Sequence, residues 1–219
     1  MKHLAKPLFA LCLVLFAALA RAGAYDDFFM AVRQDDTRTV QALLQKGFDP
    51  NTRDPKGLHG LHLALQQSAL KVARVLAEWP RTHVEARTVQ DESPLMLAAL
   101  QGQLALARLL VDKGADVNKP GWAPLHYAAT NGHLELMQLL LDESAYVDAE
   151  SPNGTTPLMM AAHYGTVQAV RLLLDAGADP LLKNQLGLTA MDFAHRANRA
   201  DVADMIAAAV RARQPRGKW

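Results

Sequence analysis

The chain has 219 residues, half of them hydrophobic and 21% charged, and its formal net charge at pH 7 is +1. Such a balance provides no basic excess over the body of the chain, so it argues against nucleic acid and against an anionic membrane surface as partners. The sequence contains one cysteine, which excludes a fold held together by disulfides within the chain.

The first residues have the order of a secretory signal peptide. Lys2 and Lys6 provide a positive start, Leu8–Leu19 is apolar throughout, and Ala20–Ala24 offers small residues two apart. We expect cleavage after Ala24 or after Ala22, with Ala24 preferred because a helix can begin cleanly at the residue that follows. Residues 1–24 are therefore predicted to be a signal peptide that directs the protein to the periplasm or outside the cell.

The alternative is a leader that stays attached and tethers a scaffold to the inner membrane. The apolar run is about 12 residues long, short of the roughly 20 that a helix needs to span a bilayer. We therefore expect no stable membrane insertion after cleavage. Cys12 leaves with the leader, and 20 basic and 22 acidic side chains remain, a net charge of −2. A chain without cysteine can enter an oxidising compartment without forming disulfides.

The remaining sequence repeats itself. Ser93–Ala99 returns as Ala123–Ala129 and again as Thr156–Ala162, and weaker copies stand at His59–Ala64 and Thr189–Ala194. The apolar residue that the copies share falls at steps of 34, 30, 33 and 33 residues. Steps of this size are typical of a protein built from stacked structural repeats. The shared residues are Leu61, Leu95, Leu125, Leu158 and Met191.

One copy shows the expected local structure. In residues 151–183, Ser151–Gly154 is turn chemistry, and Thr156 can cap a helix whose first residue is proline. Gly165 is expected to turn the chain back after that helix. A second apolar helix then runs to a glycine stop at Gly177. Each unit is thus predicted to be a helix, a tight turn, a second helix and an extended loop.

This pattern resembles the ankyrin repeat. The helix-opening Thr-Pro-Leu-His element of that family stands here as Ala123–His126, and its inter-helix Asn-Gly-His stands as Asn131–His133. The family's Leu-Leu-x-x-Gly-Ala-Asp-Val-Asn ending appears as Leu109–Asn118, and again in shortened form as Leu173–Pro180. The resemblance covers residues 25 to 210 and implies an all-α ankyrin solenoid with short hairpin loops.

The repeat pattern divides residues 25–213 into six units whose outer two have the polar substitutions expected of caps. A basic end, Arg211–Trp219, follows, and we expect it to be frayed, with residues 214–219 as a flexible tail. A role for this end as an electrostatic docking arm remains open. The predicted units are 25–53, 54–87, 88–118, 119–150, 151–183 and 184–213.

Three irregularities interrupt the pattern. The 30-residue step reflects a clipped loop at Lys119–Trp122, which should leave a notch in the row of projecting loops. Trp79–His83 replaces the usual glycine-stopped turn, and Ser68 stands where other units have glycine, so that a positive φ there would be mildly costly. We expect residues 60–87 to be the least regular stretch of the chain.

No catalytic constellation stands out: the chain has no phosphate-binding glycine loop and no nucleophile elbow. The family resemblance assigns structural roles to His62, His126 and His133. His59 and His62 form an H-x-x-H pair without a glutamate between them, so we expect no metal and no cofactor. A metal-dependent hydrolase that uses His59, His62 and an acidic neighbour is the competing class.

The resemblance also implies a binding surface along the concave side, formed by loop tips and the ends of the first helices. Interface energy concentrates in Trp, Tyr and Arg, and Trp122 adjoins the clipped loop, while Tyr127 is expected in the core. The predicted function is non-catalytic binding of another protein by a monomer, as an accessory, protective or immunity factor. The predicted contact residues are Arg87, Gln101, Trp122, Asn131, His163 and Tyr164.

Overall fold

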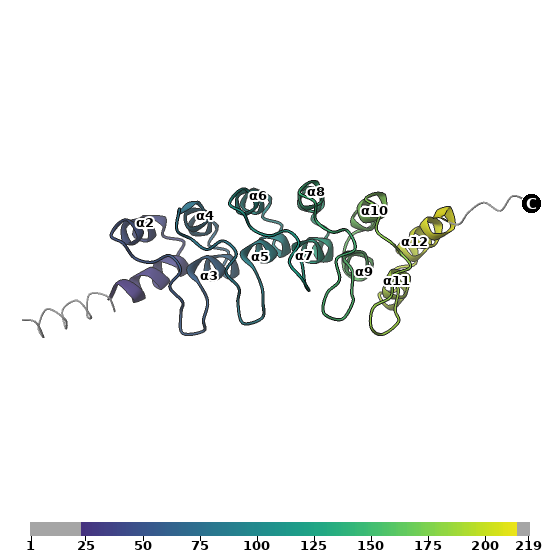
Figure 1. Ribbon diagram of the computed structural model, residues 1–219, viewed down its shortest axis with the longest axis horizontal. Coiled ribbons are helices and arrows are strands. Elements are labelled where there is room, and N and C mark those ends of the chain that lie inside the picture. Colours follow the sequence, from purple (N-terminus) through teal and green to yellow (C-terminus); the bar gives the residue numbers. More distant parts are fainter. Residues whose placement is uncertain (1–22, 214–219) are drawn as a thin grey trace, which may run out of the picture. The chain divides into compact units, whose positions relative to one another are not determined.

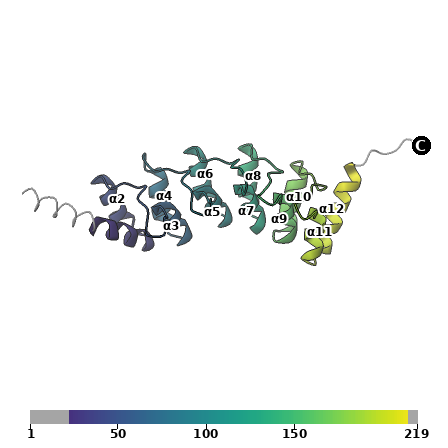
Figure 2. The ribbon, with the colours of Figure 1, turned by 60° about the horizontal axis from the view of Figure 1, so that its bottom comes forward.

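The computed structural model describes residues 23–213. Within these residues the chain is helical, with no strand beyond an isolated backbone bridge between Arg53 and His59. The chain forms two compact units, one that ends at His83 and one that begins at Val84, and both are drawn in Figures 1 and 2. Residues 1–22 of the predicted leader and the whole predicted tail, residues 214–219, lie outside the described residues.

The first unit contains a helix over residues 23–33 followed by three helices, of which α4 packs against both α2 and α3. Phe28 is fully buried and stacks on Phe48 with 4.5 Å between the ring centroids. A Cβ atom at Gly60 would lie 2.8 Å from the Phe28 ring, so glycine replaces the proline of other copies because the aromatic ring occupies that space. The helices are α2 Thr37–Gln45, α3 Gly60–Gln66 and α4 Leu70–Glu78.

The second unit contains four helix pairs in two layers. The first helices of the pairs, α5, α7, α9 and α11, pack one against the next, and the second helices, α6, α8, α10 and α12, form a parallel layer of neighbours. The loops before α5, α9 and α11 project from the first-helix side, and the loop before α7 is visibly shorter (Figure 1). The bounds are α5 Pro94–Leu100, α6 Leu104–Asp112, α7 Pro124–Asn131, α8 Leu134–Asp142, α9 Pro157–His163, α10 Val167–Asp175, α11 Ala190–Arg196 and α12 Ala200–Arg213.

Each of these helices lies inside one of the predicted repeat units, while the unit boundaries themselves, which fall in loops, stay predictions. The expected helix start at Thr156 is confirmed: its hydroxyl accepts the Met159 N–H, and Pro157 is the first helical residue. Ser93 caps α5 in the same way. Ala123 has no side chain that can do so, and there the Nδ1 atom of His126 accepts the Ala123 N–H at 3.1 Å.

The turns between paired helices are of two kinds, with and without a residue of positive φ. Gly102 and Gly132 have φ values of +67° and +69°, and Ser68 has the expected positive φ of +56°, which costs a non-glycine residue about 1 kcal/mol. Gly165 lies, as expected, where the chain turns after the end of α9, but this glycine has no positive φ. A Cβ atom there would lie 2.3 Å from the carbonyl oxygen of Ala129, so Gly165 is required by the close approach of α9 to α7.

Side-chain hydrogen bonds join neighbouring loops within each unit. In each case a side-chain oxygen in the loop after one second helix accepts a backbone N–H from the corresponding loop one repeat later. The donor–acceptor distances are 2.7–3.1 Å. Asp49, Asp116 and Asp179 stand in the turns after second helices, and each side chain accepts the N–H of the residue two positions later, which shapes those turns. The acceptor and donor pairs are Asn51 and His83, Glu85 and Asp116, Asn118 and Tyr146, and Asp148 and Asp179.

The predicted irregularities have distinct structures. Trp79 ends α4 in an extended conformation (φ −69°, ψ 127°) without a glycine turn, and the first compact unit ends shortly after it. In the clipped loop, Lys119 is only 5% exposed, pairs with the Asp91 carboxylate and donates to the Pro120 carbonyl at 2.9 Å. A buried ammonium group thus closes the loop that lacks the usual residues.

The expectation of a frayed end is wrong for Arg211 to Arg213, which continue α12. The Arg213 guanidinium donates to the Ala178 carbonyl at 2.8 Å and lies 3.6 Å from an Asp179 carboxylate oxygen. These contacts hold the last turn of α12 against the loop after α10.

Candidate functional site

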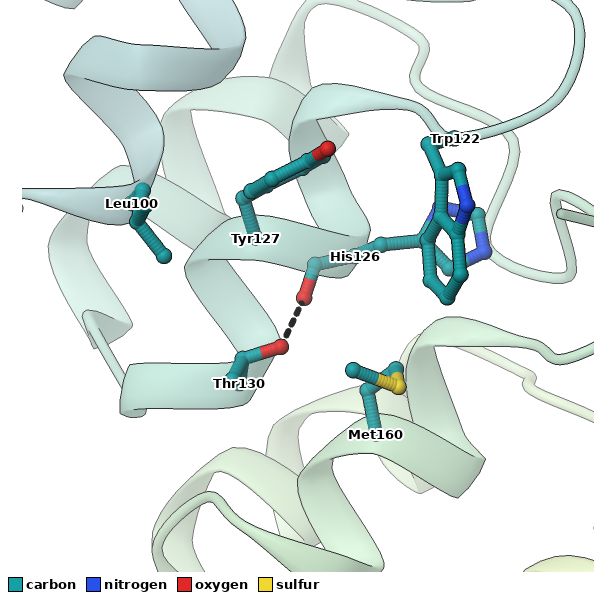
Figure 3. A pocket seen from close by; sticks show the side chains of 6 residues that line it. All are labelled: Leu100, Trp122, His126, Tyr127, Thr130 and Met160. Atoms are coloured by element: carbon teal, nitrogen blue, oxygen red, sulfur yellow. Dashed lines mark hydrogen bonds between the residues drawn. The ribbon is translucent and has the colours of Figure 1, made fainter. Parts of the chain in front are cut away.

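The second unit has a cavity of about 220 Å³ on its first-helix side (Figure 3). Side chains from three successive repeats line it, and nearly all the lining atoms are apolar. The only polar groups that its side chains bring are an indole N–H, an imidazole, a phenol and one hydroxyl. The lining residues are Leu100 from the end of α5, Trp122 from the clipped loop, His126, Tyr127 and Thr130 from α7, and Met160 from α9.

The register of the repeats explains why these residues meet. Tyr127 and Met160 stand two residues after the shared apolar residue of their repeats, and Leu100 and Thr130 stand five residues after it. Residues three apart on a helix share one face. The fifth and second positions therefore face the same side of each first helix, and Leu100 and Tyr127, from successive repeats, line one cavity.

Trp122 forms one wall of the cavity and is half-buried. Its indole packs edge-on against the His126 imidazole, with 5.2 Å between centroids, and lies 6.4 Å from the Tyr127 ring. In Figure 3 the indole is drawn over the imidazole, and Met160 lies below the two rings. The clipped loop ends directly at Trp122, so the notch predicted there coincides with a lined cavity.

His126 is a structural residue, as the resemblance implied. Its Nδ1 atom accepts the Ala123 N–H, so Nε2 carries the proton and donates to the Thr155 carbonyl at 2.9 Å. Burial lowers the pKa of His126, and the neutral ring is the form that both hydrogen bonds require. Thr130 donates to the His126 carbonyl at 2.8 Å, the bond drawn in Figure 3. These hydrogen bonds fix the orientation of the His126 ring in the wall of the cavity.

The expectation that Tyr127 belongs to the core is wrong, since the residue is only half-buried and lines the cavity. The buried side of α7 is occupied by Leu125, Ala128 and Ala129, which leaves the Tyr127 ring at the edge of the groove. Burial, and to a smaller extent the carboxylates of Glu92 and Asp91, raise the pKa of the Tyr127 phenol. Its hydroxyl thus stays protonated and can donate a hydrogen bond.

A second aromatic cluster follows the same register one repeat further on. His163 packs against Tyr164 at 4.0 Å between centroids and against Phe193 at 6.1 Å. Tyr164 is 60% exposed, and His163 and Phe193 are half-buried. Two of the six predicted contact residues, His163 and Tyr164, therefore lie together on this cluster.

The other predicted contact residues are engaged within the fold. Asn131 donates to the Leu100 carbonyl at 2.6 Å, and His133 donates to the same carbonyl at 3.2 Å, which gives His133 its expected structural role. Arg87 pairs with Glu85 and lies 3.6 Å from an Asp91 carboxylate oxygen. Gln101 is half-buried and does not line the cavity. Of the six residues, Trp122 alone belongs to the cavity.

Sequence reasoning missed Tyr127 and Met160 as lining residues. The signal that identifies them is the second position after the shared apolar residue, which holds Leu97, Tyr127, Met160 and Phe193 in the four repeats of the second unit. Leu97 is 5% exposed, whereas the other three are half-buried. A large side chain at that position thus marks the groove.

Among the described residues, the H-x-x-H pair in the first unit is not part of a metal-binding group. His59 and His62 are both buried, with 5.9 Å between their ring centroids. Over residues 23–213, no group of three or more His, Cys, Asp or Glu side chains is placed to hold a metal ion. Nor is any helix of this part of the chain long and apolar enough to cross a membrane.

The comparisons with known proteins agree with the repeat architecture. A family model described as ankyrin repeats (3 copies) matches residues 28–121, 81–151 and 125–214. An ankyrin repeat domain from Acinetobacter baumannii has a similar solved structure, with a TM-score of 0.73 and 28% sequence identity over 84% of this chain and 97% of that one.

Curated relatives match the chain over part of their length. Human NF-kappa-B inhibitor alpha is 37% identical over 94 residues, which are 41% of this chain and 30% of the relative. Rat ankyrin repeat and SAM domain-containing protein 6 is 31% identical over 152 residues, which are 69% of this chain and 14% of the relative. The chain thus spans less than a third of the length of either relative. Because one ankyrin-repeat model matches in three overlapping stretches over most of its length, the chain belongs to the ankyrin-repeat family, whose members generally bind other proteins.

Proposed function

We propose that this protein is a non-catalytic binding module that is exported to the periplasm and holds a partner protein through the cavity at Trp122 and the neighbouring Tyr164 cluster. The observation that carries the proposal is the apolar cavity of about 220 Å³, which opens on the first-helix side of the second unit. Its walls come from three successive repeats of the fold.

The cavity suits one large apolar side chain of a partner. An apolar cavity of roughly 150 Å³ is known to take a benzene ring, and burying a Leu, Met or Phe side chain stabilises a complex by about 1.5–3 kcal/mol. Trp and Tyr are the residues in which binding energy concentrates. Trp122 and Tyr127 in the cavity and Tyr164 beside it provide such anchors.

The predicted leader supports the compartment in this proposal. A signal peptide at residues 1–24 would deliver a chain without cysteine to the periplasm. There it would act as an accessory, protective or immunity factor for another exported protein. One relative, an NF-kappa-B inhibitor by name, is a precedent for regulation of a second protein by an ankyrin-repeat chain.

The test is recovery of partners from a periplasmic extract on immobilised protein. We compare wild type with a double variant, Trp122→Ala plus Tyr164→Ala, and with Tyr146→Ala as the matched control. Tyr146 is 67% exposed in the same unit and does not line the cavity at Trp122. We expect a specific partner to be retained by wild type and by the control and lost from the double variant. Equal recovery by all three proteins contradicts the proposed surface.

Export has its own measurement. The mass of the protein purified from the native host reports its N-terminus. A chain that begins at Tyr25 or Gly23 supports a periplasmic protein, and an intact leader supports the membrane-tethered scaffold instead.

A further inference from the structure

His59 occupies a position that serves another purpose in the other repeats. It is the residue directly before the first helix of its repeat, where Ser93, Thr156 and Thr189 cap their helices with a hydroxyl group. His59 makes no capping hydrogen bond to α3. It is 7% exposed, and neither ring nitrogen has a hydrogen-bond partner among the described residues. A buried polar ring without partners is costly, and it becomes far more costly when it carries a charge.

The surroundings of the His59 ring do not accommodate a charge. The loop before α3 brings the Arg53 guanidinium, and the segment after α4 brings His83; both oppose a positive charge on His59, while Asp49 favours it less strongly. His62 lies next to it on α3. The helix over residues 23–33 contributes the apolar Phe28 ring against Gly60, beside His59 in the chain, and the Tyr25 hydroxyl, which donates to the Arg53 carbonyl at 3.0 Å. The carboxylate of Asp54 is engaged with the N–H groups of Lys56 and Leu58.

We propose that His59 makes the first unit sensitive to acid: on protonation its ring leaves the buried site, and the loop over residues 49–59 and the first turn of α3 open together. The ring and the loop are coupled through the backbone, because His59 bridges to Arg53 and Asp54 closes the same turn. In the open state the charged ring is hydrated, and α3 loses its first turn.

The sign follows from linkage. Burial, Arg53 and His83 lower the pKa of His59 in the folded unit below the ordinary value of 6.5, whereas the open state has that ordinary value. The open state therefore binds more protons, and opening becomes more favourable as pH falls below 6.5. At pH 5.0 the opening equilibrium should rise by at most about 30-fold relative to neutral pH, the factor for a group that titrates only when open.

The second unit provides an internal comparison. His126 is also buried, but its two nitrogens are bonded to Ala123 and Thr155, and its titration is the same whatever residue stands at position 59. Any acid effect of His126 therefore cancels when wild type is compared with a variant at His59.

The experiment is amide hydrogen exchange on the whole protein at pH 7.5 and 5.0, with rates corrected for the intrinsic effect of pH. The variant is His59→Thr, which places at this position the residue that caps α9 at Thr156, and His195→Thr is the control because His195 is exposed. In wild type and the control we expect peptides within residues 49–66 to exchange about 10- to 30-fold faster at pH 5.0. In His59→Thr this acceleration should vanish, while peptides of α7 behave alike in all three proteins.

If His59→Thr is not folded at pH 7.5 by circular dichroism, His59→Gln takes its place with the same expectation. Equal acceleration in wild type and the His59 variant overturns the proposal. So does an NMR titration in which the His59 ring becomes charged near pH 6.5 while the 49–66 amides stay protected.

Discussion

Replacing Gly165 by alanine tests the packing of successive repeats at its tightest point. Gly165 follows α9 and lies against the end of α7 in the preceding repeat. An alanine Cβ at this position would lie 2.3 Å from the Ala129 carbonyl oxygen and 2.9 Å from the Ala161 Cα atom. Both are backbone atoms, so no side-chain rotation can relieve the contact.

The magnitude follows from the overlap. A carbon and a carbonyl oxygen approach to about 3.3 Å in favourable contacts, so α7 and α9 would have to separate by about 1 Å. Overpacking a well-filled interior typically costs 1–3 kcal/mol and occasionally more. Because Ala129 also accepts the Gly132 N–H in the adjoining turn, we expect Gly165→Ala to lower the free energy of unfolding by about 3 kcal/mol.

The assay is equilibrium unfolding in urea, followed by Trp122 fluorescence in a background where Trp79 and Trp219 are phenylalanine. The control is Gly177→Ala. Gly177 has a φ of +100° and no atom within 4 Å of its Cβ position, so only backbone strain opposes alanine there, at a cost of about 1–2 kcal/mol. A loss below about 1 kcal/mol for Gly165→Ala, or a smaller loss than for Gly177→Ala, would refute the close approach of α7 and α9.

Three further predictions concern the same unit. Leu139 is 4% exposed, so Leu139→Ala should cost about 2–5 kcal/mol in urea unfolding, and a change below about 1 kcal/mol would mean that the faces of α8 are wrongly assigned. Asp91→Asn leaves the buried Lys119 ammonium group without its carboxylate and should lower the free energy of unfolding by about 2 kcal/mol. Lys119→Met removes the charge itself and should cost less. Thermal unfolding of both variants checks this order. Burial lowers the pKa of His126 below 6.5, and the folded unit holds the neutral ring. The free energy of unfolding should therefore fall as pH drops below about 6.5, by at most about 2 kcal/mol at pH 5.0. Unfolding curves at neutral pH and at pH 5.0 should show a smaller pH dependence for His126→Gln than for wild type.

Much of the fold could be predicted because its signals are local. The cap at Thr156, the proline that follows it, and the positive φ of Ser68 depend only on neighbouring residues, and all three are present in the structure. The clipped loop was visible as a short repeat step. What could not be seen there is that a buried Lys119 closes it on Asp91, a contact between residues 28 positions apart.

The candidate site was predicted only in part, because exposure within a repeat stack depends on the neighbouring repeats. Asn131 and Arg87 have the polar side chains of a binding surface, yet one bonds the preceding repeat and the other pairs within its own loop. Tyr127 has the apolar ring of a core residue, yet it lies at the edge of a cavity.

The amino-acid sequence by itself determined the repeat length, the pairing of helices and the family, since these follow from hydrophobic period and turn chemistry within about 33 residues. Only the tertiary structure decided that Trp122, Tyr127 and Met160 share a cavity, and that Gly165 is needed for its missing side chain instead of its φ. Both depend on how closely one helix pair stacks on the next, and that spacing results from the packing of many side chains at once.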